Sequence, residues 1–183
     1  DFVKAYLQGR YASIKEVSPQ KASLLYALDR FEAAPEIRAA LDAGKIVLAN
    51  RYVASNMGHQ GAKIKNADER MRFFLWVQDL EFKILEIPKP DLNVVLHVPA
   101  KVAQQLVDLK TGAERAYTKG KSRDLHESNL AHLKRAEQVY LELSRIFPKQ
   151  FNLLECSNGK TLKPIDQVGE QIWTLVRKKL GLK

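Results

Sequence analysis

The chain has 183 residues, 45% of them hydrophobic, which suits one globular domain because single domains commonly run to about 100–200 residues. Its single cysteine, Cys156, and the absence of any run of about 20 apolar residues argue against a disulfide-stabilised or membrane-spanning protein, so we expect a soluble cytoplasmic protein. The formal net charge of +9 is compatible with binding to nucleic acid, to an anionic surface or to a phosphorylated ligand. The basic residues, however, are spread over predicted helices, with one concentration between residues 110 and 123. We therefore expect no nucleic-acid or membrane partner.

The first predicted elements are two helices. Ser18 and Pro19 are typical of an N-cap and a first helical residue, and the apolar residues that follow predict a helix to about Ala33. A second, short helix is predicted for residues 35–43. Gly44 suits the left-handed position that follows a helix end.

The first predicted strand covers residues 45–49, a continuous apolar run typical of a strand buried on both faces. We expect it to be a central parallel strand. Polar and glycine residues fill positions 50–61, and an amphipathic pattern rich in helix formers predicts a long helix over residues 66–85.

The second half of the chain alternates strands and helices in the same way. Strands are predicted at 93–98 and 151–156, a polar turn at 157–160, and helices at 99–109, 125–147 and 165–180. Strands that alternate with helices predict an α/β fold with a parallel sheet.

Asn50 and Arg51 directly follow the predicted strand at 45–49. Ligands of open parallel sheets bind beyond the carboxyl ends of the strands, so residues at this point are candidates for a site. The forked donors of an arginine can hold a phosphate at two points. For an arbitrary strand end, however, we would favour an ordinary ion pair with a neighbouring carboxylate.

The residues that follow Arg51 decide between these interpretations. The segment 50–60 contains Asn-Arg-Tyr, then Ser-Asn, then His-Gln, and it resembles the thymidylate kinase motif Asp-Arg-Tyr, Ser-Ser or Ser-Asn, aromatic-Gln. The resemblance implies that Arg51 holds the phosphate of the monophosphate acceptor. It also implies that Ser55 and Asn56 contact the base and the deoxyribose.

Within this segment, Gln60 matches the family, and the resemblance implies that His59 and Gln60 also belong to the dTMP-binding residues. Two positions depart from the family's pattern. His59 stands where the family more often has Tyr, which leaves open whether it excludes a ribose hydroxyl. Asn50 replaces the more usual Asp, and an amide can coordinate Mg²⁺ but cannot neutralise its charge. His97 stands where many relatives have Asp, and we interpret it as a strand-end residue rather than a general base.

Tyr26 and Arg30 are four residues apart on a predicted helix, so they share one face. A flat ring can stack on a base while a guanidinium donates to a carbonyl oxygen. Considered alone, Tyr26 would be a core residue and Arg30 a surface cation. Their spacing resembles the family's aromatic-x-x-Asp-Arg segment, which implies that together they bind thymine.

The basic segment of residues 110–127 resembles the family's lid and its Asp-x-x-Glu ending. Cations that close over the transferring group stabilise phosphoryl transfer. The resemblance implies this role for four residues: Arg115, Lys119, Lys121 and Arg123. We rank Lys121 and Arg123 first, as catalytic residues beside Arg51, and a solvated charge run is the alternative. Glu127 matches the acidic residue associated with the metal and the lid.

The family's first strand and its Gly-x-x-x-x-Gly-Lys-Ser/Thr loop, which cradles the ATP phosphates, are not present in these 183 residues. We expect them in a segment of a full-length enzyme that precedes Asp1. A deliberate truncation and a natural protein without kinase activity are the alternatives.

These features predict a P-loop nucleoside-monophosphate-kinase fold over residues 1–183, as a single domain with a lid at about 110–127. The resemblance implies transfer of the γ-phosphoryl group of ATP to dTMP, giving dTDP, with Mg²⁺ held by Asn50 and Glu127, in a homodimer. The alternatives are another deoxynucleotide or deoxynucleoside kinase and a non-catalytic nucleotide-binding or assembly protein derived from the kinase fold. A nucleic-acid binder is a more distant alternative that rests on charge alone.

Overall fold

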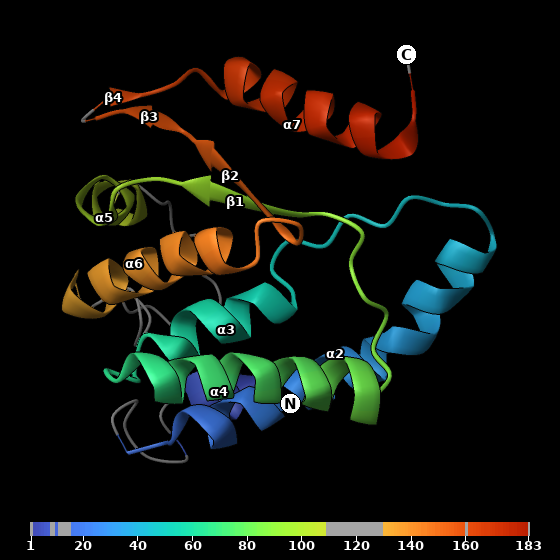
Figure 1. Ribbon diagram of the computed structural model, residues 1–183, viewed down its shortest axis with the longest axis vertical. Helices are drawn as coiled ribbons and strands as arrows, with labels where there is room; N and C mark the ends of the chain where they lie inside the picture. Colours follow the sequence, from blue (N-terminus) through green and yellow to red (C-terminus); the bar gives the residue numbers. More distant parts are fainter. Residues whose placement is uncertain (1, 8–9, 11–15, 109–129, 160, 183) are drawn as a thin grey trace. The chain divides into compact units, whose positions relative to one another are not determined.

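A computed structural model describes residues 2–7, 10, 16–108, 130–159 and 161–182, which fall into two compact units, residues 1–89 and 90–183 (Figure 1). None of the described helices is both long enough and apolar enough to span a membrane.

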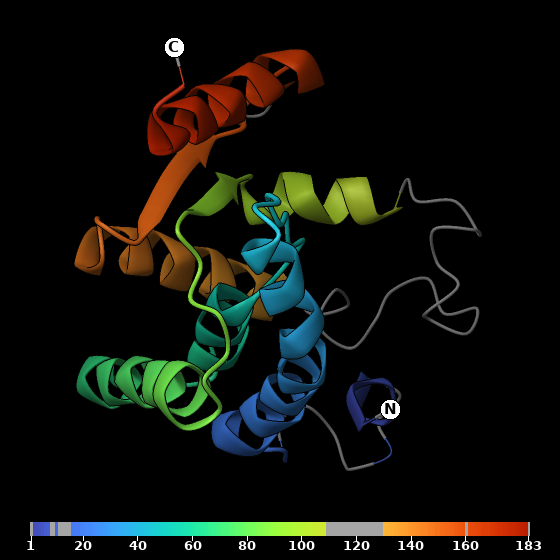
Figure 2. The same ribbon diagram turned by 90° about the vertical axis from the view of Figure 1, so that its right-hand side faces the viewer.

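The first unit is helical. Its elements are α1 (Phe2–Leu7), α2 (Pro19–Asp42), α3 (Val53–Gly61), α4 (Ala67–Gln78) and a π-helix, η1 (Asp79–Ile84). Helix α3 contacts both α2 and α4 (Figure 2). The core holds small residues of α2 and larger ones of α3 and α4, namely Ala22, Ala27, Val53, Met57, Phe73, Phe74 and Val77.

Helix α2 begins as predicted but ends later. The Ser18 hydroxyl accepts a hydrogen bond from the Lys21 amide at 3.2 Å, which is the expected N-cap. The helix then continues through Pro35 to Asp42, so the prediction of two separate helices was wrong. Proline removes one donor, but Ala34 beside it is fully buried, and packing together with alanine-rich surroundings offsets that loss. Gly44 has φ +73°, the predicted left-handed conformation.

Residues 45–49 form no strand, so this prediction was also wrong. Ile46 is 71% exposed and Leu48 is 93% exposed. A strand needs a neighbour to complete its ladder of hydrogen bonds, and no described strand pairs with this segment. The apolar run therefore lacks the two-sided burial that its composition indicates.

The segment after it is more regular than predicted. The polar and glycine residues between 50 and 61 include the whole of α3. Asn66 caps α4, where its Oδ1 accepts from the Glu69 amide at 3.0 Å. The predicted helix over 66–85 is confirmed, with its last turns in the wider π-helical form of η1.

The second unit is built on two parallel strands, β1 (Asn93–His97) and β2 (Phe151–Glu155), paired so that His97 lies opposite Glu155. Its helices are α5 (Ala100–Asp108), α6 (Leu130–Ile146) and α7 (Ile165–Leu180), and α6 and α7 lie on opposite sides of β2 (Figure 1). The short strands β3 (Ser157–Asn158) and β4 (Thr161–Leu162) form a hairpin at the predicted polar turn. The predicted strands and helices of this half are confirmed to within one residue at their described ends, and residues 109 and 125–129 of the predicted helices lie outside the described part.

Candidate functional site

Arg51 lies between residues 45–49 and α3, in a backbone conformation that is unusual for residues other than glycine. Its φ is +68°, which costs roughly 1–2 kcal/mol for an L-residue. Tyr52 is the N-cap of α3, and the Arg51 side chain is exposed. Arg51 Nη2 lies 2.8 Å from His59 Nε2. Because a guanidinium can only donate, this hydrogen bond requires His59 Nε2 to be the unprotonated acceptor.

Asn56, in the middle of α3, is 2% exposed. Its Nδ2 donates to the Ser23 carbonyl oxygen at 3.1 Å and to Glu81 Oε1 at 3.0 Å. Its Oδ1 has no hydrogen-bond partner among the described residues. A buried acceptor without a partner is costly, so this oxygen is a candidate ligand contact.

Arg30 of α2 binds the same carboxylate. Its Nε lies 2.5 Å from Glu81 Oε2 and its Nη2 lies 2.7 Å from Glu81 Oε1. The side chain of Glu81 is completely buried, and this two-point ion pair compensates its charge. The carboxylate thus joins Arg30 of α2 to Asn56 of α3 from a position in η1, and π-helices are frequent at functional sites.

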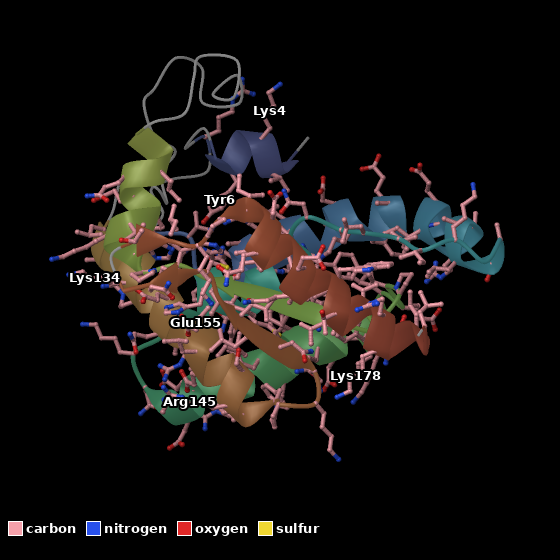
Figure 3. All side chains as sticks on the ribbon, turned by 90° about the horizontal axis from the view of Figure 1, so that it is seen from above. Lys4, Tyr6, Lys134, Arg145, Glu155 and Lys178 are labelled. Carbon is pink, nitrogen blue, oxygen red and sulfur yellow. The ribbon has the colours of Figure 1, made fainter. Side chains whose placement is uncertain are left out.

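Tyr26 sits on α2 against a second group of polar residues. Its ring makes an edge-on contact with Tyr6 of α1, with centroids 6.0 Å apart (Figure 3 labels Tyr6). Tyr6 is 1% exposed, and burial raises its pKa to about 12 although a hydrogen bond with Gln60 opposes the shift. Lys63 Nζ donates to the Tyr6 hydroxyl at 3.2 Å. Gln60, predicted to bind substrate, therefore contacts the residue behind Tyr26.

Tyr52 connects the Arg51 segment to the residues that follow η1. Its hydroxyl donates to the Pro88 carbonyl oxygen at 2.9 Å. Burial raises the pKa of its phenol, and the charge of Arg30 lowers it while that of Glu81 raises it. Ser55 is half-buried on the next turn of the same helix, and Asn50 is exposed.

A separate charged cluster lies in the second unit, at the carboxyl ends of β1 and β2. His97 Nδ1 is 2.6 Å from Glu155 Oε2, and His97 Nε2 is 3.0 Å from Glu137 Oε1 (Glu155 is labelled in Figure 3). Glu137 Oε2 also accepts from the Ala100 amide. Burial lowers the pKa of His97, but its hydrogen bonds to the two carboxylates outweigh burial, so the pKa is raised.

A family model described as thymidylate kinase matches residues 3–172 of this chain. The chain belongs to the thymidylate kinase family. The match covers the Arg51 segment, the Arg30–Glu81 pair and both parallel strands, and it confirms the resemblance drawn from the sequence. The α/β kinase fold predicted with it is confirmed as well.

Similar thymidylate kinases come from several organisms. A relative from Mycobacterium tuberculosis is 31% identical over 145 residues, which are 79% of this chain and 64% of the relative. One from Deinococcus radiodurans is 26% identical over 162 residues, 88% of this chain and 69% of that protein. The solved thymidylate kinase of Candida albicans matches with a TM-score of 0.63 at 21% identity, over 96% of this chain and 74% of that one. The chain thus spans about 64% of the length of the Mycobacterium relative.

For this thymidylate kinase family member, sequence reasoning missed Glu81. A signal was present, because Phe74, Val77 and Glu81 follow one another at helical spacings of three and four. A carboxylate on a buried face needs a strong partner, which predicts an arginine nearby. The contact between Lys63 and Tyr6 was missed too, because it joins segments distant in sequence.

The lid residues of the family lie outside the described residues. This applies to Arg115, Lys119, Lys121, Arg123 and Glu127. Within the described ranges, no group of three His, Cys, Asp or Glu side chains could hold a metal ion. Of the two candidate metal ligands, only Asn50 is described.

Proposed function

We propose that this chain carries the acceptor-binding part of an enzyme that transfers the γ-phosphoryl group of ATP to dTMP, giving dTDP. The observation that carries the proposal is the pairing of Arg30 and Asn56 through the buried carboxylate of Glu81. It leaves a guanidinium donor and an amide acceptor beside each other in a member of the thymidylate kinase family.

The two groups suit a thymine ring. Thymine offers a carbonyl oxygen to the Arg30 donor and an N–H group to Asn56 Oδ1, which has no other partner among the described residues. Tyr26 supplies a flat ring on the same helix as Arg30, and the ring packs edge-on against Tyr6. Ser55 precedes Asn56 on α3 and is the candidate for contacts to the sugar.

Arg51 is the candidate for the acceptor phosphate. Its fork suits a phosphate, and its hydrogen bond to His59 holds the guanidinium before the ligand arrives. Phosphoryl transfer depends mainly on positioning and charge stabilisation, and the acceptor phosphate oxygen is itself the nucleophile, so this proposal needs no protein base. Lys121 and Arg123 would add lid cations over the transferring group.

Mg²⁺ is the proposed cofactor. It prefers oxygen ligands and is usually held by one or two protein side chains together with substrate phosphates, so the amide oxygen of Asn50 fits this chemistry. Glu127 is the second candidate ligand. When bound, the ion neutralises charge on the phosphates.

A homodimer is part of the same proposal. Leu24, Leu28 and Phe31 follow one another at spacings of four and three on α2, and their exposed fractions are 40%, 46% and 50%. Such a stripe is suited to burial against a second copy. Light scattering at several protein concentrations tests it, and a strictly monomeric full-length protein would contradict it.

The decisive experiment is an ATP-coupled assay of the full-length protein with dTMP, dUMP, dCMP and thymidine. We expect turnover with dTMP and the highest kcat/KM for it. Turnover of thymidine instead would support a deoxynucleoside kinase. Binding of dTMP without any turnover would support the non-catalytic nucleotide-binding alternative.

A further inference from the structure

Among the described residues, Glu81 is the carboxylate that contacts both of the base-binding candidates, Arg30 and Asn56. Its Oε1 accepts from Arg30 Nη2 at 2.7 Å and from Asn56 Nδ2 at 3.0 Å, and its Oε2 accepts from Arg30 Nε at 2.5 Å. The side chain is fully buried. Every one of these contacts uses the carboxylate as an acceptor.

The consequence for Asn56 is a fixed amide orientation. An amide has a donor end and an acceptor end that are almost equal in shape, and only its partners decide which way it is turned. The two partners of Asn56 Nδ2 are the Glu81 carboxylate and the Ser23 carbonyl oxygen, neither of which can donate. Rotating the amide by half a turn would set Oδ1 against two acceptors. Oδ1 is therefore the end left for a ligand.

The consequence for Arg30 is a fixed position of its guanidinium. Its contact with Glu81 uses Nε and Nη2, and this side-on pairing does not use Nη1. A guanidinium has donors only. The pair of residues consequently offers one acceptor, on Asn56, and one donor, on Arg30.

We propose that Glu81 sets the base preference of the site, by fixing Asn56 as an acceptor and by holding the donor of Arg30 beside it. The proposal rests on the proposed function, in which the site binds a pyrimidine monophosphate. Thymine and uracil present an N3–H donor next to an O4 acceptor, which complements this pattern. Cytosine presents an N3 acceptor next to a 4-amino donor, which opposes it at both points. Glu81 is thus a positioning residue that selects the keto pyrimidines.

The test compares three variants of the full-length protein: Glu81→Gln, Glu81→Asp and Asp79→Asn. Glutamine keeps the shape of Glu81 but adds a donor, so Asn56 can turn its Oδ1 towards it and present Nδ2 to the ligand. Aspartate keeps the acceptor-only carboxylate. Asp79 lies in η1 too, is exposed and pairs with Lys83, so Asp79→Asn removes an equal charge away from the site.

The readout is the ratio of kcat/KM for dTMP to kcat/KM for dCMP, with the thermal shift produced by each nucleotide without ATP as a binding measurement. We expect Glu81→Gln to lower the ratio about 10- to 100-fold, the effect of one buried hydrogen bond to a charged group. We expect Glu81→Asp to keep the ratio within a few fold and Asp79→Asn to leave it unchanged.

A folded Glu81→Gln protein with an unchanged ratio, or with equal losses for both nucleotides, would overturn the proposal. If Glu81→Gln does not fold, Glu81→Asp decides, because a collapse of its ratio would show that the acceptor character of this position is not what selects the base. The thermal shifts separate the two proposals. If the protein has no turnover but binds dTMP selectively, and Glu81→Gln relaxes that selectivity, the kinase function is refuted and the role of Glu81 is supported. If the protein turns over dTMP and Glu81→Gln leaves the ratio unchanged, the kinase function is supported and the role of Glu81 is refuted.

Discussion

Nη2 of Arg51 lies 2.8 Å from Nε2 of His59, across two turns of α3. The arginine precedes the helix and the histidine lies in its last turn. The contact forms only while His59 Nε2 accepts, so the neutral imidazole holds the guanidinium in place. His59, which stands where the family more often has Tyr, is thereby connected to Arg51, the candidate for binding the acceptor phosphate.

Replacing His59 with Phe should weaken acceptor binding. The ring is kept, but Arg51 loses its hydrogen-bond partner and has more freedom to lose when phosphate binds. We expect KM for dTMP to rise about 3- to 10-fold, with KM for ATP unchanged. His59→Gln, which can retain an acceptor oxygen, is the matched variant and should lie closer to wild type. Equal KM values for dTMP in all three proteins would exclude this role.

The backbone conformation of Arg51 should lower the stability of the protein, whereas its side chain should contribute to activity. Its φ of +68° is tolerated by glycine but strains alanine. We expect the free energy of unfolding of Arg51→Gly to exceed that of Arg51→Ala by about 1 kcal/mol in urea denaturation. Both variants should lose about 10- to 100-fold in kcat/KM for dTMP, because each lacks the phosphate donor. Equal stabilities would mean that the chain relaxes out of the left-handed conformation.

The elements that could be predicted from sequence are those whose pattern is local. Residues 165–180 are helical as predicted, because their apolar period and the glycine after their end suffice to define α7. The apolar run at 45–49 has an equally clear pattern but forms no strand. A strand depends on hydrogen bonds to another segment, and composition alone cannot supply that segment.

The same difference between local patterns and long-range contacts applies to the functional site. Arg51 and Asn56 could be found from a motif within eleven residues of chain. The carboxylate that joins Arg30 to Asn56 could not, because Glu81 lies 51 residues from Arg30 and 25 from Asn56 along the chain. Its partners are visible only once α2, α3 and η1 have packed together.

His97 should stabilise its unit in a pH-dependent way. Its pKa is raised in the folded protein because two carboxylates outweigh burial. A raised pKa means that the stabilisation is complete below the unfolded pKa of about 6.5 and is lost as pH rises through the folded value. We expect thermal denaturation of wild type and His97→Gln to differ most near pH 6 and to converge as pH rises. A difference in melting temperature between the two proteins that grows as pH rises would contradict the stabilisation of protonated His97 by Glu137 and Glu155.

The contribution of Lys63 to stability should depend on pH in the opposite direction. Its Nζ donates to the Tyr6 hydroxyl and to the Val17 carbonyl oxygen, both at 3.2 Å, but burial lowers its pKa to about 8. Between that value and the ordinary value near 10.4, the unfolded chain binds more protons than the folded one, so stability rises with pH across this window. Below it, the folded protein bears the cost of a partly buried ammonium group.

Lys63→Met removes that titration while keeping a side chain of similar length. We expect the free energy of unfolding of this variant, relative to wild type, to fall as pH is raised from 7 to 9.5, because only the wild type gains stability there. Lys65→Met, at an exposed position two residues away, is the matched control and should follow wild type across the range. Urea denaturation at each pH measures all three. A constant difference between Lys63→Met and wild type would show that the amine titrates alike in the folded and unfolded chains, and that burial beside Tyr6 does not perturb it.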